Sequence, residues 1–299
     1  MERRLIYIVN PISGTKNKSS LQEVISAKTT AAGFAFEMYP SVANGDYSFL
    51  DHLIKEKKIT DVIIAGGDGT INQVINSLRR LEVQFGILPC GSGNGLAFSA
   101  GIPKNIEKAL DIVFTGKAKA TDAFMVNETF ACMLCGLGFD AQVALDFAND
   151  PNRGVTTYIK QTVKNFFTAK AYPFRISTDG RQFATDAFFI SIANSNQFGN
   201  NFKIAPKASL TDGLLDIVVM TKQNKLSMLL QALKQVGGFT QLQQAEVLNE
   251  KSSVLYFQTG ELKIINAKEA PMHIDGDPVE TEKTITIKLL HQSFRLIGP

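Results

Sequence analysis

Apolar residues in the first third of the chain occur in short runs that alternate with stretches of helical periodicity. Four runs have the length and composition of strands, at residues 5–9, 34–39, 61–65 and 84–89. Helical patterns separate them, around residues 20–32 and 47–57 and through Ile71, Val74, Ile75 and Leu78. This alternation predicts parallel β-α-β units, and ligands of such sheets bind beyond the carboxyl ends of the strands.

Beyond about residue 120, strand patterns follow one another mostly without helices between them. Residues 174–178 and 181–185 predict a hairpin, because Asp179-Gly180 between them suits a type I′ turn. Further strand candidates lie at residues 186–194, 214–220, 253–259, 262–266 and 284–290. This pattern is typical of an antiparallel domain. We predict an α/β domain over residues 1–122 and an all-β domain over 123–290, with a cleft between them.

Two amphipathic stretches interrupt the second domain. One runs from Tyr158 to Phe167, with lysines at 160, 164 and 170 near it, and the other spans residues 226–236. A helix that docks on a membrane and a helix that covers a sheet both have the pattern of the first stretch. We favour the sheet-covering interpretation for it.

Composition is that of an ordinary globular protein, since 44% of the residues are hydrophobic and 20% are charged. A net charge of +3 is too small to indicate a nucleic-acid partner, although it is compatible with weak attraction to an anionic membrane. We expect no leader, because Met1–Arg4 runs directly into a strand-like segment. We expect no membrane span either, because no apolar stretch approaches roughly 18 residues. The three cysteines stand in apolar contexts. We therefore expect a cytoplasmic protein, with Cys132 and Cys135 as two buried thiols.

Three loops follow predicted strands and are rich in Gly, Ser or Asn. The first runs from Asn10 to Lys16 and contains Ser13, but it lacks the Walker A spacing and can equally be a plain turn. The second is Gly66-Gly67-Asp68-Gly69-Thr70, with more glycines than a tight turn needs. Glycines let backbone N–H groups approach phosphate oxygens at the positive end of the helix that follows.

The third loop repeats this design before a helix near Leu96. It contains Gly91, Ser92, Gly93 and Asn94. A Rossmann fingerprint would follow the first strand and have an acidic residue about twenty positions later, and this loop does not fit that pattern. Two glycine loops on consecutive strand ends favour a phosphate site over two plain turns.

Asp68 stands among groups suited to anions, where its charge would repel a phosphate. The carboxylate makes sense if Mg²⁺ or its water shell lies between, or if it takes a proton from a nucleophile. Either role belongs to phosphoryl transfer. Two more acidic turns, Asp275-Gly276-Asp277 and Asp212-Gly213, are compatible with such chemistry or with ordinary turns.

Four motifs stand in a fixed order: Asn-Pro-x-Ser-Gly from Asn10, Gly-Gly-Asp-Gly-Thr-Ile-Asn from Gly66, Pro-x-Gly-Ser-Gly-Asn from Pro89, and Asp-Gly-acid from Asp275. In order and spacing they resemble the diacylglycerol kinase catalytic-domain family, which includes sphingosine and ceramide kinases and soluble bacterial lipid kinases. The resemblance covers nearly the whole chain. Gly-Gly-Asp-Gly-Thr is shared with NAD kinases, whereas the stretch from Pro89 to Ala97 is not.

The resemblance implies a three-layer α/β domain of the NAD kinase and phosphofructokinase type, which binds ATP, and a C-terminal antiparallel β-sandwich. It also implies that residues 291–299 return to the first domain. Ser41 enters only through the resemblance, because it stands where relatives have a threonine. The loops and the resemblance together nominate as nucleotide-binding residues Asn10, Ser13, Lys16, Ser41, Gly66, Gly67, Asp68, Gly69, Thr70, Ile71, Asn72, Gly91, Ser92, Gly93 and Asn94.

By the same resemblance, the Asp-Gly-acid turn supplies the base that activates a lipid hydroxyl. Relatives carry glutamate at its second acid, so the shorter Asp277 leaves the assignment open between Asp275 and Asp277. A structural Mg²⁺ would bind Asp212 together with the carbonyls of Ser209 and Leu214. The residues after Gly93 are closer to those of sphingosine kinases than to those of bacterial diacylglycerol kinases, which does not decide the lipid.

The sequence therefore predicts an ATP- and Mg²⁺-dependent lipid kinase that visits the membrane surface to collect a lipid alcohol. An NAD kinase and a catalytically silent nucleotide- or lipid-binding protein stay open as alternatives. The mainly apolar strands of the second domain disfavour the first alternative, and the set Asp68, Asp212 and Asp275 disfavours the second. A homodimer is compatible with the sequence but not indicated by it.

Overall fold

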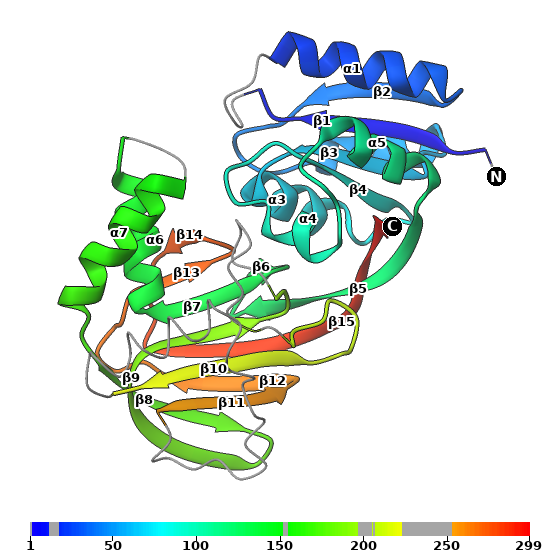
Figure 1. The fold of residues 1–299 in the computed structure, drawn as a ribbon. Helices are drawn as coiled ribbons and strands as arrows, with labels where there is room; N and C mark the ends of the chain where they lie inside the picture. Colours follow the sequence, from blue (N-terminus) through cyan, green and yellow to red (C-terminus); the bar gives the residue numbers. More distant parts are fainter. Residues whose placement is uncertain (1, 12–17, 152–154, 197–204, 206, 223–252) are drawn as a thin grey trace. The chain divides into compact units, whose positions relative to one another are not determined.

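The computed structural model describes residues 2–11, 18–151, 155–196, 205, 207–222 and 253–299. The predicted helix at 226–236 and the nominated Ser13 and Lys16 lie outside these residues. Contacts divide the chain into two compact units, Met1–Asp122 with His291–Pro299 (unit 1) and Ala123–Leu290 (unit 2). Unit 1 is an α/β unit and unit 2 is a β-sandwich, as predicted (Figure 1).

The parallel strands of unit 1 nearly coincide with the four predicted runs. They are β1 (Arg4–Val9), β2 (Ala35–Pro40), β3 (Asp61–Gly66) and β4 (Gln84–Pro89). They are arranged in the order β2-β1-β3-β4, and Leu296 of β15 (Thr284–Gly298) pairs with Phe85 of β4. Because β2 and β3 lie on opposite sides of β1, the strand order reverses between β1 and β3. Open α/β sheets bind ligands at such a reversal.

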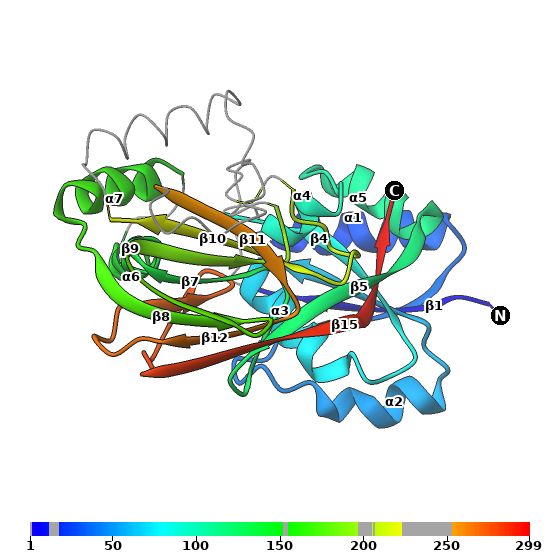
Figure 2. The same ribbon diagram turned by 90° about the horizontal axis from the view of Figure 1, so that it is seen from below.

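Helices lie on both sides of these strands, and Figure 2 shows α1 and α5 on one side and α2 on the other. They are α1 (Lys18–Ala31), the 3-10 turn η1 (Ser48–Leu50), α2 (Asp51–Glu56), α3 (Asp68–Leu78), α4 (Gly95–Ser99) and α5 (Ile106–Thr115). The apolar stripe predicted for α3 is buried. Helix α5 was not predicted from the sequence. It begins after Asn105, whose side chain accepts the Lys108 N–H. This cap marks the start of the helix.

Unit 2 is built from antiparallel strands. They are β6 (Thr129–Ala131), β7 (Leu134–Gly138), β8 (Tyr172–Thr178), β9 (Arg181–Ala193), β10 (Leu215–Thr221), β11 (Val254–Thr259), β12 (Glu261–Ile265), β13 (Met272–Ile274) and β14 (Asp277–Val279). Along the main path the order is β14-β13-β7-β9-β8-β12-β15, and β10 pairs with β9 and β11. β5 (Lys117–Val126) and β15 contribute residues to both units.

The predicted Asp179-Gly180 hairpin is confirmed. Thr178 pairs with Arg181, and the two turn residues have φ of 44° and 73°, as a type I′ turn requires. The division of the following residues into strands at 181–185 and 186–194 is wrong, because β9 runs through both. Asp186 lies inside this long strand and is exposed, so a single polar residue did not end it.

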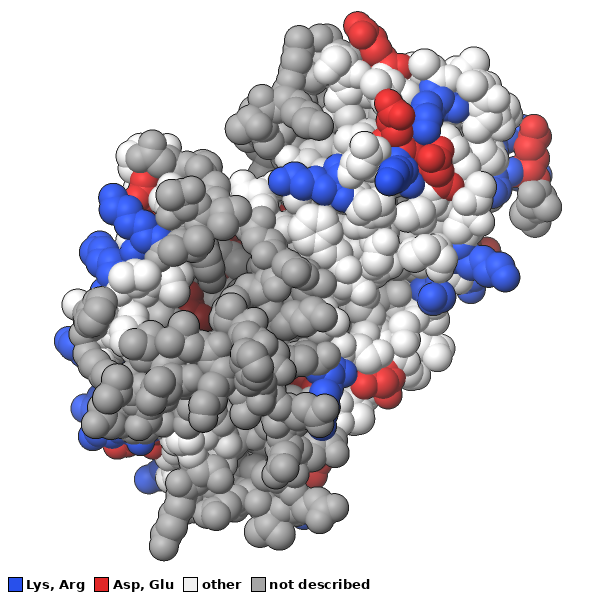
Figure 3. Space-filling view, in the orientation of Figure 1, with Lys and Arg blue, Asp and Glu red and all other residues white. Residues whose placement is uncertain are grey.

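In the part of unit 2 that the structure describes there are two helices, α6 (Phe139–Asn149) and α7 (Val155–Thr168), and only the second was predicted. Phe166 of α7 packs against a buried cluster that includes Phe188, Phe189 and Tyr256, which supports the sheet-covering interpretation. Val163 on the same helix is 53% exposed. Exposed lysines accompany it, and Figure 3 shows basic side chains where α7 lies in Figure 1. None of the helices within the described ranges has the length and apolar character that crossing a bilayer requires.

Candidate functional site

Residues that directly follow β1, β3 and β4 contact one another at the carboxyl ends of these strands. The Asn10 side chain, after β1, donates from Nδ2 to Thr70 Oγ1 at 2.7 Å, and the Asn10 N–H donates to Ala65 O at 2.9 Å. After β4, the Cys90 N–H donates to Gly66 O at 2.9 Å. Within the part of the chain that the structure describes, hydrogen bonds therefore connect the start of the first loop and the start of the third loop to residues at or beside the second.

Glycines allow the second and third loops to touch through their backbones. A Cβ added to Gly91 would lie 2.5 Å from the Cα of Gly67, which is closer than real Cβ contacts come. A Cβ on Gly93 would lie 2.8 Å from Asp68 Oδ2, so this carboxylate lies against the third loop. A backbone surface without side chains is what a phosphate cradle needs.

Asp68 is the first residue of α3 and is half-buried. A carboxylate in the first turn is stabilised by the positive end of the helix, so Asp68 also has a structural function. Gly67 caps the helix with extended backbone and offers no side-chain hydrogen bond. The N–H groups in the first turn of α3 therefore point out of the N-terminal end of the helix, where they can bind an anion.

Two of the nominated nucleotide-binding residues support the loops from inside. Asn94 is buried with φ of 57°, and its side chain both accepts the Gly91 N–H at 2.8 Å and donates to Gly91 O at 2.9 Å. Ile71 lies in the core, and its N–H donates to Gly67 O at 3.0 Å. Neither side chain reaches the surface, so both act on the shape of the loops.

The other nominated residues of unit 1 that the structure describes lie around the same strand ends. The Ser41 N–H donates to Val9 O at 3.0 Å, which places the residue beside the end of β1. Ser92 is exposed, and Gly69 and Asn72 in the first turns of α3 are half-buried.

In unit 2, Asp275-Gly276 forms the turn between β13 and β14. Both residues have positive φ, 50° and 91°, and Ile274 pairs with Asp277. This is hairpin geometry, as the plain-turn alternative predicted. The turn nevertheless carries a buried side chain, because Asp275 is only 6% exposed.

The Asp275 carboxylate is fully engaged by the segment that precedes and opens β7. Oδ1 accepts the N–H groups of Met133 and Leu134, and Oδ2 accepts the N–H of Cys132, each at 2.9 Å. The Cys132 thiol donates to Oδ2 at 3.3 Å. Four donors match the four lone-pair sites of a carboxylate. Cys132 and Cys135 are buried free thiols, as predicted.

Asp277 differs from Asp275 in its exposure and in its hydrogen bonding. The residue is exposed, and its carboxylate makes no side-chain hydrogen bond to another described residue. The protein atoms packed around the carboxyl still partly desolvate it, and this desolvation raises its pKa. The charge of Asp275 raises the pKa further, whereas a charge on His273 lowers it.

The nominated metal residues form an exposed turn before β10. Asp212 Oδ1 accepts the Leu214 N–H at 3.2 Å, and Ser209 Oγ accepts the Thr211 N–H at 3.4 Å. No three His, Cys, Asp or Glu side chains gather into a metal cluster within the described ranges. A site at this turn would thus use one carboxylate with carbonyls and water, a ligand set that Mg²⁺ accepts. It stays a prediction.

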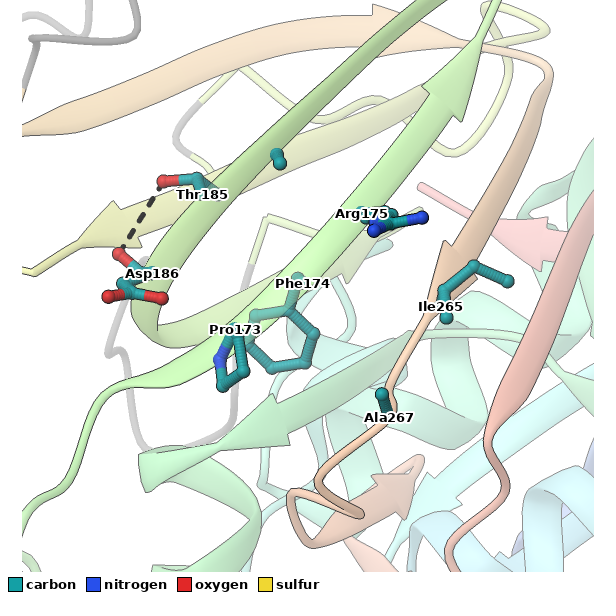
Figure 4. Close-up of a pocket in the computed structure, with 8 residues that line it drawn as sticks. Pro173, Phe174, Arg175, Thr185, Asp186, Ile265 and Ala267 are labelled. Carbon is teal, nitrogen blue, oxygen red and sulfur yellow. Dashed lines mark hydrogen bonds between the residues drawn. The ribbon is translucent and has the colours of Figure 1, made fainter.

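A surface hollow of about 570 Å³ lies elsewhere on unit 2. Figure 4 shows its lining residues on β8, β9 and the end of β12. They are Pro173, Phe174, Arg175, Ala184, Thr185, Asp186, Ile265 and Ala267. None of them belongs to the nominated site, so the hollow is not the centre that the motifs indicate.

Among the buried polar residues that were not predicted from the sequence are Asp122, Asp140 and His273. Asp122 accepts the Gln292 N–H at 2.7 Å and lies 2.9 Å from His291 Nδ1. Asp140 and His273 lie beside the Asp275 turn. His273 stands two residues before the Asp275-Gly276-Asp277 turn, but no local signal connects it to an acid more than a hundred positions away.

Two family models match the chain. "Diacylglycerol kinase catalytic domain" matches residues 4–126, and "YegS C-terminal NAD kinase beta sandwich-like domain" matches residues 134–296. The boundary between the two matches lies close to the boundary between the two units.

Similar proteins extend over most of the chain. A diacylglycerol kinase of Bacillus subtilis (strain 168) is 28% identical over 283 residues, which cover 92% of this chain and 89% of that one. A probable lipid kinase YegS-like of Enterobacter sp. (strain 638) is 32% identical over 232 residues, covering 75% and 73%. A crystal structure of a diacylglycerol kinase from Bacillus anthracis str. Sterne has a TM-score of 0.76 at 20% identity and covers 99% and 97%; this likeness concerns the fold.

Proposed function

The chain belongs to the diacylglycerol kinase catalytic-domain family, and from this premise we propose that it transfers the γ-phosphoryl group of ATP to the hydroxyl of a lipid alcohol, with Mg²⁺ as cofactor. The observation that carries the proposal is that Asn10 after β1 and the glycine loops after β3 and β4 lie together beside the N-terminus of α3, at a reversal of strand order. Substrate, nucleotide and metal are our inference from this geometry and from the family.

The loops of unit 1 would hold the phosphates of ATP. Gly67, Gly91 and Gly93 keep side chains out of the surface, and the first turn of α3 supplies N–H groups and a positive dipole. Mg²⁺, when bound, offsets phosphate charge, which explains a carboxylate at Asp68 among groups suited to anions. Asp212, with the carbonyls of Ser209 and Leu214, would hold a structural Mg²⁺ in unit 2.

Asp277 is our candidate for the base that takes the proton of the lipid hydroxyl. The lone-pair sites of Asp275 are occupied by the 132–134 segment, so Asp275 has none to offer an acceptor hydroxyl. Asp277 is exposed, and its raised pKa makes it a better proton acceptor than an ordinary aspartate. Asp275 then positions the turn and does not take part in the chemistry.

The function is tested with purified protein, γ-labelled ATP and Mg²⁺. Acceptors are offered separately: NAD, and a panel of lipid alcohols in mixed micelles that includes a diacylglycerol and a sphingoid base. We expect label in one or more lipids. Label in NAD would instead establish an NAD kinase, whose motif Gly66–Thr70 the chain shares. Nucleotide binding without label in any acceptor would favour a silent binding protein.

Asp68→Ala serves as the matched negative variant in this assay. Since Asp68 is half-buried at a helix start, we expect the fold and most of the thermal stability to persist while turnover is lost. Circular dichroism and a melting curve check the first expectation, and the labelled product checks the second. Retained turnover would remove Asp68 from the site.

Gly91→Ala tests the cradle itself. The added Cβ would lie 2.5 Å from the Gly67 Cα, so the second and third loops must separate. Overpacking of this kind costs about 1–3 kcal/mol, and 1.4 kcal/mol corresponds to a tenfold change in Kd. We expect ATP affinity, measured by calorimetry, to fall by about tenfold or more. Gly260→Ala is the control, because a Cβ there meets nothing within 4 Å; an equal effect of the two variants would contradict the cradle.

A further inference from the structure

A histidine lies completely buried directly behind the turn that carries Asp277. His273 of β13 has no exposed surface, and its Nδ1 accepts the Gly276 N–H at 3.3 Å. An imidazole nitrogen can accept only if it carries no proton. This contact therefore requires the neutral ring with its proton on Nε2.

An acid faces the other nitrogen of this ring. Asp140, in the first turn of α6, places Oδ2 at 3.5 Å from His273 Nε2, while its Oδ1 accepts the Ala141 N–H at 2.8 Å. Asp140 Oδ2 is buried and makes no hydrogen bond to another of the described residues. A carboxylate in this position favours the proton on Nε2, the same tautomer that the Gly276 contact requires.

The strand beside the pair leaves room for it. Gly136 of β7 is the register partner of His273, and a Cβ there would overlap both Asp140 Oδ2 and His273 Nε2. Any residue other than glycine would push the acid and the imidazole apart. Three elements, β7, β13 and α6, thus combine to bring the two side chains together.

We propose that Asp140 and His273 form a buried positioning pair for the Asp275–Asp277 turn. Asp140 fixes the tautomer of His273, and His273 holds the N–H of Gly276, the residue that immediately precedes Asp277. Asp275 anchors the other side of the turn to residues 132–134. With both sides held, the backbone that carries Asp277 has one position. The effect of the pair on catalysis by Asp277 rests on the proposed function, whereas the tautomer of His273 does not depend on it.

The tautomer is measured by ¹⁵N NMR on protein labelled at histidine. The chain has three histidines, and the other two, His52 and His291, have side chains 90% and 53% exposed. We expect the buried ring to carry its proton on Nε2 at neutral pH. A proton on Nδ1, or on both nitrogens, would overturn the proposal whether or not the protein phosphorylates lipids.

Asp140→Asn is expected to reverse this tautomer. The Ala141 N–H needs the remaining side-chain oxygen as its acceptor, so the amide nitrogen faces His273 Nε2 and donates to it. The ring proton then moves to Nδ1, where it opposes the Gly276 N–H. Asp146→Asn is the matched control on the same helix, because Asp146 contacts Gln142, Lys164 and Asn165 and not the turn. An unchanged tautomer in Asp140→Asn would overturn the proposal.

Kinetics then separate positioning from a merely structural role. Misplacing a catalytic group costs on the order of tenfold or more in rate, so Asp140→Asn and His273→Ala should each lower kcat by about tenfold and leave the KM for ATP unchanged. His273→Asn puts an amide oxygen near the place of Nδ1 and should recover most of this loss. In the His273→Asn background, Asp140→Asn should have little further effect on kcat. The proposal would be overturned if Asp140→Asn lowered kcat equally in the wild type and in the His273→Asn variant. It would also be overturned if His273→Asn had a kcat as low as that of His273→Ala.

If wild-type protein labels no lipid, the proposed function fails and these rate comparisons lose their meaning. The NMR arm still decides whether the pair fixes the tautomer. The two failures are therefore distinguishable.

Discussion

Replacing Asp277 with Asn lowers kcat for lipid phosphorylation by on the order of 100- to 10,000-fold, the range that general-base catalysis contributes. The amide keeps the size of the side chain but cannot take the hydroxyl proton. Because Asp277 is exposed in unit 2 and the nominated ATP-binding residues belong to unit 1, we expect ATP affinity to stay the same. Steady-state kinetics and calorimetric titration with ATP measure the two quantities.

Asp277→Glu is the matched control, because it restores the glutamate that the family resemblance places at this position. Glutamate keeps the basic group and adds one methylene, so we expect activity to be retained. If Asp277→Asn turned over at the wild-type rate, the base would have to be another residue.

The same assignment predicts the pH dependence of turnover. A base works in its deprotonated form, and desolvation and the charge of Asp275 raise the pKa of Asp277 above the ordinary aspartate value of 3.8. Activity should therefore be present above this raised pKa and be lost as the pH falls through it, at a higher pH than for an ordinary aspartate. A profile of kcat against pH locates this acidic limb. A limb at or below the ordinary value would contradict the assignment.

Replacing Asp275 with Ala is expected to destabilise unit 2 and not simply to inactivate the protein. The change leaves the buried N–H groups of Cys132, Met133 and Leu134 without their acceptor. An unsatisfied buried donor costs about 1–3 kcal/mol, so three of them should lower the free energy of unfolding by about 3 kcal/mol or more. Urea denaturation followed by circular dichroism measures the loss.

Asp277→Ala is the control for stability, since its exposed side chain makes no hydrogen bond to another described residue. We expect its unfolding free energy to stay near that of the wild type while its turnover is lost. The two substitutions should therefore have different effects: Asp275→Ala lowers the free energy of unfolding, and Asp277→Ala lowers the rate of turnover. If Asp275→Ala unfolded like the wild type but lost turnover, the roles would have to be exchanged.

Local patterns predicted the parallel strands and the β8–β9 hairpin because both follow from neighbouring residues. Four runs of apolar residues were enough for β1 to β4, and an Asp-Gly pair between two runs was enough for the turn. The same method missed β7 and α6. No loop separates them, since β7 ends at Gly138 and α6 begins at Phe139. A continuous apolar stretch does not reveal where a strand becomes a helix.

For the candidate site, too, local patterns predicted some features and missed those that depend on the folded chain. Glycine-rich motifs after strands identified the loops, because the freedom of glycine is a property of single residues. They did not reveal that the oxygen and the nitrogen of the Asn94 side chain would both bond to the backbone of Gly91. That arrangement depends on how the third loop folds back on itself.

By itself, the sequence determined the order of β1 to β4 and of the helices between them, the loops suited to phosphate, and a turn with two acids from which a base could be chosen. Only the tertiary structure distinguishes those acids, because it buries Asp275 and leaves Asp277 exposed, and our proposal of Asp277 as the base rests on this difference. Whether a carboxylate can take a proton depends on which donors fill its lone pairs, and the donors to Asp275 lie 141 to 143 positions away along the chain. The meeting of Asp140 and His273 depends equally on α6 and β13, which only the folded chain brings together.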